Sequence, residues 1–298
     1  MFQRMTQFSV ALSICFLATS ALAGAQTAPP AGSSAQAAAQ SAPATKAPVP
    51  TLAVELIIQK NVEARGGLEA WRAIQSMTET GKMDANSKGT VQLPFKLEMM
   101  RPRKTRLEIV FNGHTAVQTY DGTNGWTLRP YLGRPDPDPY SEIELRKSAE
   151  QQELDGPLVD YAAKGTTAEL VGVEQVEGKD AYKIKLTLKS KAVRHIWIDA
   201  RSFLELKIED MPRILDGKPH NVDTYFRDYR PVSGLMIPFT LETAVKDVVG
   251  SKKLIIEKVE LNPKLDDMEF AKPQSLPPGA LMGRGISSGI TSVPPIKR

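Results

Sequence analysis

The sequence has very little cysteine and histidine for a chain of 298 residues. Its one cysteine, Cys15, lies near the N-terminus, so a mature chain without that segment has no thiol nucleophile and no disulfide. The three histidines, His114, His195 and His220, lie far apart. No histidine pair has zinc-site spacing, and neither a P-loop nor a G-x-S-x-G motif is present. We therefore expect a protein that is not an enzyme and that uses no metal or cofactor.

Long apolar runs are also missing. The run from Phe8 to Ala18 follows Arg4 and precedes the small-residue site Ala21-Leu22-Ala23. It is too short to cross a bilayer, and this order of features predicts a cleaved signal peptide over residues 1–23. A lipid anchor on Cys15 is disfavoured because an isoleucine, not a small residue, precedes it. The predicted location is the periplasm.

The basic charge of the chain lies outside its centre. Residues 24–50 are rich in alanine and proline and predict a disordered tether, and residues 273–298 predict a disordered tail. These ends and the signal segment hold five basic residues and no acidic ones, so the formal net charge of +4 becomes −1 for residues 51–272. A nearly neutral domain argues against a nucleic-acid partner.

Residues 51–272 are long enough for one domain with a sizeable core. Apolar residues at helical spacing predict a helix over 54–62, with Thr51 as its N-cap and Gly66-Gly67 at its end. A short second helix is expected around Trp71. In the middle of the domain, Ser141 stands three residues before a glutamate, which is a capping-box pattern.

That central helical region is interrupted by Asp155-Gly156-Pro157, so two helices are expected there, the second ending at Gly165. Elsewhere apolar and polar residues alternate with a period of two, which is typical of strands that have one buried face. The expected strands cover residues 91–100, 104–111, 181–190, 194–210 (two strands) and 254–262. The fold class is therefore α+β, with a curved antiparallel sheet as its main element.

The segment YFRDYRPVSGLMIPF, residues 225–239, has two interpretations. Two strands joined by a tight turn at Gly234 are favoured over an active-site loop, because glycine permits the positive φ of such a turn. Asp136 and Asp138 stand between prolines, and a solvated loop is favoured there over a metal site.

Four stretches in this order carry a resemblance to a known family: residues 64–77 with the Gly81 that follows, YDGTNGW at 120–126, residues 170–186, and residues 225–239. Together they resemble the bacterial outer-membrane lipoprotein-sorting proteins of the LolA/LolB-like superfamily, over most of 54–270. The resemblance implies a strongly curved antiparallel sheet, an incomplete barrel, with helices covering its open face. It also implies binding of lipoprotein acyl chains in the periplasm without a cofactor.

The apolar rows of two predicted strands offer a dry face for such a chain. We expect residues 51–272 to form a LolA-like lipid-binding domain whose ligands are lipoprotein acyl chains or phospholipid, with envelope membrane proteins as further candidate partners. The candidate lipid-binding residues are Leu93, Phe95, Leu97, Met99, Leu107, Ile109 and Phe111. The alternative is that these residues are ordinary core beneath the helices.

Three hypotheses for the function follow, in descending order. The first is a periplasmic protein that binds acyl chains in outer-membrane lipoprotein sorting. The second is a non-enzymatic sensor or interaction module whose core is filled by its own side chains and whose exposed edge is the YFRDYR segment, residues 225–230. The third is a hydrolase, which would need clustered carboxylates or a Ser/His pair in a cleft, and the sequence shows neither.

Overall fold

The computed structural model describes residues 49–151, 153–215 and 218–277. The predicted signal peptide, nearly all of the predicted tether and most of the predicted tail lie outside these residues. At the two boundaries the chain contacts the domain. The Tyr182 hydroxyl donates to the Pro50 carbonyl oxygen at 3.0 Å, and the Leu276 N–H donates to the Pro135 carbonyl oxygen at 2.8 Å. No helix within the described ranges is long and apolar enough to span a membrane.

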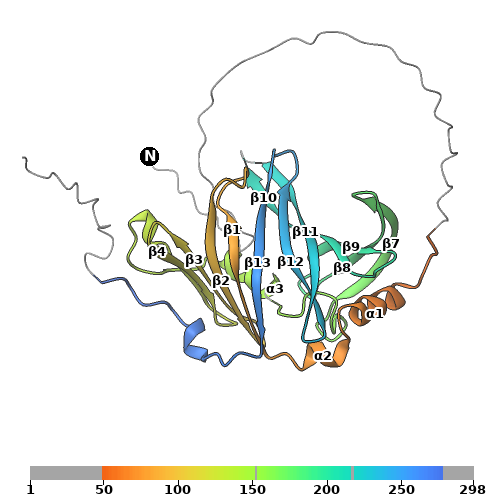
Figure 1. The fold of residues 1–298 in the computed structure, drawn as a ribbon, viewed down its shortest axis with the longest axis horizontal. Helices are drawn as coiled ribbons and strands as arrows, with labels where there is room; N and C mark the ends of the chain where they lie inside the picture. Colours follow the sequence, from red (N-terminus) through yellow and green to blue (C-terminus); the bar gives the residue numbers. More distant parts are fainter. Residues whose placement is uncertain (1–48, 152, 216–217, 278–298) are drawn as a thin grey trace, which may run out of the picture.

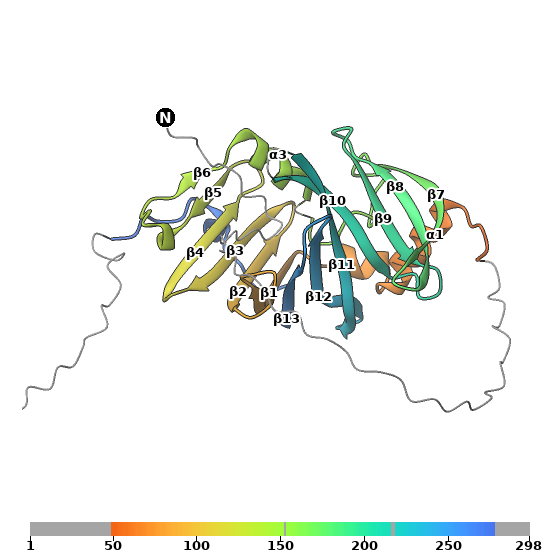
Figure 2. The same ribbon diagram turned by 90° about the horizontal axis from the view of Figure 1, so that it is seen from above.

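The described residues form one sheet of thirteen strands in the order β6-β5-β4-β3-β2-β1-β13-β12-β11-β10-β9-β8-β7, and neighbouring strands pair antiparallel. Figures 1 and 2 show it bent strongly around one side, which confirms the predicted curved, open sheet. The strands are β1 (Ser76–Asp84), β2 (Gln92–Met100), β3 (Lys104–Phe111), β4 (His114–Tyr120), β5 (Gly125–Leu128), β6 (Asp138–Pro139), β7 (Thr167–Val176), β8 (Lys179–Thr187), β9 (Val193–Asp199), β10 (Glu205–Leu215), β11 (Lys218–Val232), β12 (Leu235–Val245) and β13 (Ser251–Leu261).

Three α-helices and two 3₁₀ turns accompany the sheet: α1 (Val54–Ala64), α2 (Leu68–Arg72), α3 (Glu142–Gln151), η1 (Pro130–Leu132) and η2 (Asp267–Phe270). The predicted capping box of α3 is present, because the Ser141 N–H and hydroxyl donate to Glu144 and the Glu144 N–H donates back. The predicted N-cap at Thr51 is wrong. Helix α1 starts at Val54 after Ala53, without a side-chain cap.

The prediction of a second central helix is also wrong. Residues 154–165 form successive turns, and Asp160 has a φ of 51°, which an α-helix does not allow. The side chains of Asp155 and Asp160 instead bind arginines of other elements. Contacts with the rest of the fold therefore override the local helical pattern.

Segment 225–239 forms the end of β11 and the start of β12, joined by a turn at Ser233 and Gly234, which have φ values of 47° and 88°. The favoured interpretation is confirmed. Strand β11 pairs with β10 on one side and with β12 on the other. It is therefore not an exposed edge, and the idea that its YFRDYR segment offers one is wrong.

The connection between β6 and β7 has to cross the open side of the sheet, because these are its two edge strands. Residues 140–166, which we call the crossover, include α3 and the turns that follow it. Figure 2 shows α3 between the β6 edge and the β7 edge. The fold thus places a segment over the concave face by topology alone.

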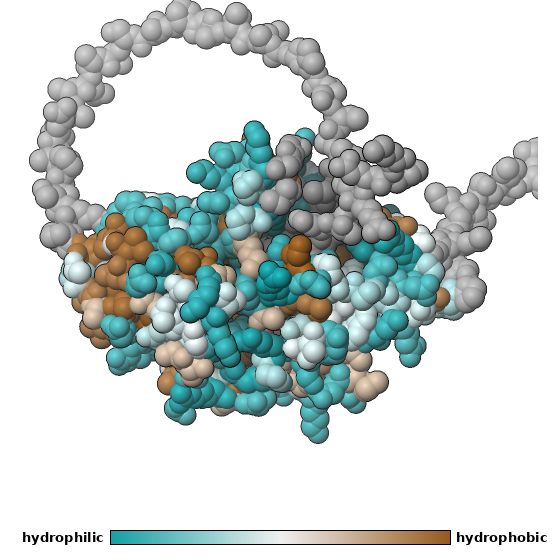
Figure 3. Space-filling model, turned by 180° about the vertical axis from the view of Figure 1, so that it is seen from behind, coloured by the Kyte–Doolittle hydropathy of each residue, from teal (hydrophilic) through white to brown (hydrophobic). Residues whose placement is uncertain are grey.

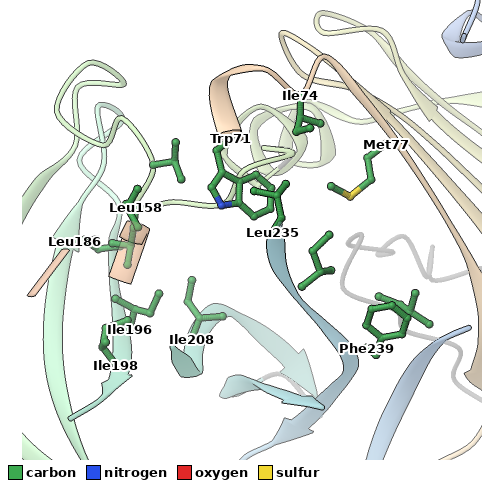
Figure 4. Close-up of a cluster of buried hydrophobic side chains, with 14 of the residues drawn as sticks. Trp71, Ile74, Met77, Leu158, Leu186, Ile196, Ile198, Ile208, Leu235 and Phe239 are labelled. Carbon is green, nitrogen blue, oxygen red and sulfur yellow. The ribbon is translucent and has the colours of Figure 1, made fainter. Parts of the chain in front are cut away.

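The core lies on this concave face, and three parts of the sheet surround it. We call β1–β6 the N-wing, β7–β10 the C-wing and β11–β13 the floor. Figure 4 shows apolar side chains from both wings pointing toward the same interior space, with Trp71 and Leu235 between them. The labelled residues of the C-wing and crossover are Leu158, Leu186, Ile196, Ile198 and Ile208, and Met77 and Phe239 lie on the other side.

Candidate functional site

The seven predicted lipid-binding residues lie together on the concave face of β2 and β3. The strand register places Phe95 opposite Ile109 and Leu97 opposite Leu107. All seven belong to the main apolar cluster or pack against it. The residues Leu93, Phe95, Leu107 and Ile109 are buried, and Leu97, Met99 and Phe111 are partly exposed. The seven residues predicted from the sequence therefore lie on one surface, and solvent can still reach three of them.

The same surface continues across β1 onto β13. Met77 pairs with Met99 on one side and with Leu261 on the other, so these three side chains share a row. Partly exposed apolar residues of β13, namely Leu254, Val259 and Leu261, also pack against the cluster. A contiguous apolar surface that is left partly open on the inside of a curved sheet is typical of a ligand-binding face.

One acidic side chain interrupts this apolar surface. Glu79 pairs with Leu97 on β2 and with Val259 on β13, so it shares the row of the candidate residues. It is only 9% exposed, and within the described part of the chain it forms no ion pair. Burial raises its pKa to about 7. Near neutral pH this carboxyl can therefore donate a hydrogen bond to a ligand oxygen or accept one from a ligand donor.

The concave face of the C-wing is closed to solvent, whereas the concave face of the N-wing is partly open. Its concave residues Ile184, Leu186, Ile196 and Ile198 have no exposed surface. Helix α1, which packs against β7, contributes the fully buried Ile57 to the same apolar cluster, and the crossover contributes Leu158, which lies beside Leu186 (Figure 4). These segments therefore cover one half of the concave face and leave the other half accessible.

The crossover is fixed over the mouth of the sheet by buried ionic contacts at Asp155. One carboxylate oxygen of Asp155 accepts from Arg101 Nη2 at 2.8 Å, and the other accepts from Lys164 Nζ at 2.7 Å. Arg101 belongs to the turn between β2 and β3, and it also donates to the carbonyl oxygens of Trp71 and Ile74. A single arginine thus joins the N-wing, the α2 region and the crossover.

A second arginine joins the crossover to the floor and C-wing. Arg65 Nη1 donates to the Asp155 carbonyl oxygen at 3.0 Å and lies 3.2 Å from a carboxylate oxygen of Glu205 on β10. Its guanidinium stacks over Trp71 at 4.4 Å. The Tyr229 hydroxyl, from the YFRDYR segment, donates to Glu205 at 2.9 Å, and burial raises the pKa of Tyr229. These residues support the crossover, so the role of Tyr229 is structural.

An apolar groove of about 620 Å³ lies between α1 and the crossover. Its apolar lining includes Ile58, Val62, Leu68, Leu158 and Tyr161. Figure 3 shows apolar side chains gathered on the side of the molecule where α1 and β7 lie. A movement of the crossover away from α1 would widen this groove toward the interior.

His195 and Asp138, two polar residues considered from the sequence, lie away from the apolar surface of β2 and β3. His195 Nδ1 lies 2.5 Å from a Glu209 carboxylate oxygen, and its ring packs near Trp197 on the convex face of the sheet. Asp138 pairs with two arginines, which lower its pKa. Among the described residues, no three His, Cys, Asp or Glu side chains cluster closely enough to hold a metal ion.

Sequence reasoning missed Glu79, Arg101 and Asp155. Glu79 alternates with Met77, Gly81 and Met83, and this period of two is the signal that could have identified both the strand and the acid on its apolar side. For Arg101 and Asp155 no local signal exists, because their contact joins residues that only the crossover brings together.

Similarities to known proteins are at the level of solved structures. No protein-family model matches the sequence, and no curated protein matches it. The chain is similar to a LolA superfamily protein from Nitrosomonas europaea, with 14% identity, 74% of this chain and 99% of the other covered, and a TM-score of 0.49.

Two further solved structures are similar to a comparable degree. A DUF1329 family protein from Desulfovibrio piger has 15% identity, covers 73% of this chain and 97% of its own, and gives a TM-score of 0.49. A third structure, described as an outer membrane lipoprotein-sorting protein domain from Vibrio parahaemolyticus, has 14% identity and a TM-score of 0.47. The match covers 72% of this chain and 94% of the other. The structures to which the chain is similar thus include members of the superfamily that its motifs resemble.

Proposed function

We propose that the protein binds a single- or double-chain amphiphile, such as the lipid part of a lipoprotein or a phospholipid, on the concave face of its N-wing. The observation that carries the proposal is the group of partly exposed apolar side chains that pack against the main cluster on β2, β3 and the adjoining floor strand β13, at Leu97, Met99, Phe111 and Val259. Apolar side chains gathered on the inside of a curved sheet and left partly open are typical of a site for an apolar ligand.

The energetics suit a chain better than a compact polar ligand. Each methylene that leaves water contributes about 0.8 kcal/mol, so an acyl chain can be held without specific polar contacts. Methionine side chains adapt to ligands of different shape, and Met77 and Met99 face each other within this row. The proposed activity is therefore binding and release, not catalysis.

The crossover is the proposed cover of the bound chain. It spans the concave face between the edge strands, is held to the sheet by the ion pair of Asp155 with Arg101, and is braced internally by the ion pair of Asp155 with Lys164. Ion pairs can break and reform without loss of the fold. An apolar groove already lies beside the crossover, and it supplies the entry path.

The place of action that we propose is the periplasm, because the sequence predicts export. In that compartment a carrier of acyl chains would shield lipoproteins on their way to the outer membrane. This role in lipoprotein sorting is the specific form of the proposal, and its partners would be envelope membrane proteins.

A second candidate function is supported by the C-wing. There the concave residues are fully covered by the protein's own helices, as expected of an interaction module with a filled core. Such a module would bind a protein partner and no lipid. The two candidates differ in whether the N-wing surface holds a ligand.

The deciding measurement is native mass spectrometry of protein purified from its own periplasm, followed by organic extraction. A stoichiometric acylated peptide supports lipoprotein sorting, and a phospholipid supports lipid carriage of another kind. A bare protein mass that stays unchanged after incubation with both ligands contradicts the proposal and favours the interaction module.

A matched pair of variants localises the site. Leu97→Glu places a charge among the partly exposed concave residues, and we expect it to abolish copurification of lipid. Val110→Glu makes the same change on β3, but Val110 is 42% exposed and points away from that face. This control should carry lipid like the wild type. Full lipid occupancy in Leu97→Glu would show that the face is wrong.

A further inference from the structure

Arg194 of β9 is a buried cation with two guanidinium nitrogens that have no hydrogen-bond partner among the described residues. Arg194 is only 7% exposed to solvent. The two nitrogens are Nε and Nη2, and both are fully buried. It alternates with Ile196 and Ile198, which belong to the main apolar cluster, so Arg194 lies on the concave side of the sheet. Leu186 is its cross-strand neighbour on β8.

Buried guanidinium nitrogens without hydrogen-bond partners lower the stability of a protein that has no ligand bound. Unpartnered buried polar atoms cost about 1–3 kcal/mol each, and more when the group is charged. Native structures seldom contain them without a reason such as a bound ion or ligand. The guanidinium fork matches the oxygens of a phosphate or carboxylate, which is why arginine is common at sites for such groups.

The charges around Arg194 are mixed: Asp210, which interacts with Arg194, also interacts with the cation Arg213 and with the acid Asp223. Asp210 on β10 accepts a hydrogen bond from the Thr224 hydroxyl at 2.6 Å, and burial raises its pKa while the charges of Arg194 and Arg213 lower it. Burial lowers the pKa of Lys147 on α3, and the nearby charge of Arg213 adds to this effect while that of Glu144 opposes it. The partly exposed Arg213 and Lys147 lead from the surface toward Asp210 and Arg194.

We propose that Arg194 binds the anionic headgroup of an amphiphile, a phosphate or a carboxylate, whose chain lies on the concave apolar face. This inference rests on the proposed function and specifies its ligand. The apolar surface selects for a chain, and the buried guanidinium selects for a negative charge at its end. The protein would then distinguish anionic from neutral amphiphiles of equal length.

An internal counter-ion is the alternative partner. Glu150 on α3 also has a buried carboxylate oxygen, Oε2, without a hydrogen-bond partner. If α3 moved so that Glu150 met Arg194, the pair would be structural and would stabilise the fold. Removing Arg194 would then leave a buried acid without its cation and would destabilise the protein.

The test uses isothermal titration calorimetry with decyl phosphate, 1-decanol and inorganic phosphate, each below any micelle-forming concentration. We expect the wild type to bind decyl phosphate about tenfold more tightly than decanol, and inorganic phosphate alone only weakly. In Arg194→Met the two decyl ligands should bind with equal affinity. The control Arg201→Met, at an exposed position in the turn after β9, should behave like the wild type.

Thermal unfolding of the ligand-free proteins separates a ligand-binding arginine from a structural one. Arg194→Met should unfold at the same or a higher temperature, because it removes two buried nitrogens without hydrogen bonds, while Asp210 keeps its hydrogen bond from Thr224 and the nearby charge of Arg213. A lower unfolding temperature would indicate an internal partner such as Glu150 and would overturn the proposal. So would an unchanged preference for decyl phosphate in this variant.

A second variant keeps the proposal testable if Arg194→Met does not fold. Asp210→Asn removes the acid nearest to the site and retains its shape, so decyl phosphate should bind about threefold more tightly while decanol binding stays the same. No change in Asp210→Asn would count against the site. Tight binding of inorganic phosphate alone would also overturn the headgroup assignment. Failure of wild-type protein to bind decanol or decyl phosphate would instead contradict the proposed function itself.

Discussion

The two wings of the sheet are built from the same alternating pattern but finish in different states. In the C-wing, Ile184 and Ile196 have no exposed surface, because residues of α1 and of the crossover pack in the same apolar cluster. In the N-wing, Leu97 and Met99 occupy equivalent inward positions and remain partly exposed. The same period-two pattern therefore makes a closed core where α1 and crossover residues such as Leu158 pack on it, and a partly open apolar surface elsewhere.

The difference shows what decides between a structural and a functional apolar face. A strand sequence specifies which side chains point inward, but it does not specify what covers them. In this fold the cover comes from segments distant in sequence, namely α1 for the C-wing and residues 140–166 for the mouth. Variants that weaken the packing of either segment therefore test directly how the two wings differ.

The largest expected effect is a difference between the wings in how much stability an alanine substitution removes. Ile184→Ala should lower the free energy of unfolding by about 3–4 kcal/mol, because it leaves a cavity in a filled core. Leu97→Ala should lower it by about 1 kcal/mol, because the side chain is already partly in water. Urea unfolding of both variants measures the difference. Equal costs would mean that the N-wing is as filled as the C-wing.

The next effect concerns the crossover. Asp155→Ala removes the carboxylate that Arg101 and Lys164 share, and we expect a loss of about 3 kcal/mol in unfolding free energy. Limited proteolysis should then cut within residues 153–166 first. As a control, Glu69→Ala removes an exposed partner of Arg72 and should cost less than about 0.5 kcal/mol. Resistance of Asp155→Ala to the protease would show that other contacts hold the crossover.

A third prediction concerns the pH dependence of stability in the N-wing. The pKa of Glu79 is raised from 4.5 to about 7 in the folded protein, so the unfolded state binds fewer protons between these values. Stability from the neutral carboxyl is present at lower pH and is lost as the pH rises through about 7. Glu79→Gln should therefore be more stable than the wild type by about 2–3 kcal/mol at pH ~8, and by little at pH ~4.5. Chemical unfolding at both pH values tests this, and a constant difference would contradict it.

The smallest effect lies between the wings, at the start of α3. Ser141→Ala removes the capping hydroxyl and should cost about 1 kcal/mol of stability. Circular dichroism melting measures the cost, and Ser141→Asp should restore most of it. A change in lipid affinity in Ser141→Ala with no change in stability would assign α3 a direct part in binding.

Much of the sheet could be predicted because its pattern is local. Strands β2, β3 and β8 alternate without interruption, and their turns contain residues that accept positive φ, such as Asn112 and Glu177 before glycine. Strand β1 escaped prediction because Glu79 and Gly81 stand at inward positions where apolar residues are expected. The predicted face on β2 and β3 exists as a surface, and its binding of lipid stays a prediction.

The remainder depends on contacts between distant residues. The turns at 154–165 look helical in sequence, but Arg72 and Arg101 hold Asp160 and Asp155 in another conformation. The YFRDYR segment looks like an exposed edge, yet β10 and β12 enclose it. Arg194 carries no local signal either, since only its burial and its unpartnered atoms mark it.

The pairing of β1 with β13 has a consequence for how the protein is made. Met77 at one end of the domain pairs with Leu261 at the other, whereas the remaining neighbours in the sheet are consecutive in the chain. Each run of consecutive strands can form as it is synthesised, but the seam between them has to wait for the last strand. Non-local pairings of this kind raise contact order and slow folding. Until β13 emerges, β1 has an unpaired edge beside an uncovered apolar face, so a newly made chain is most prone to aggregation just before completion.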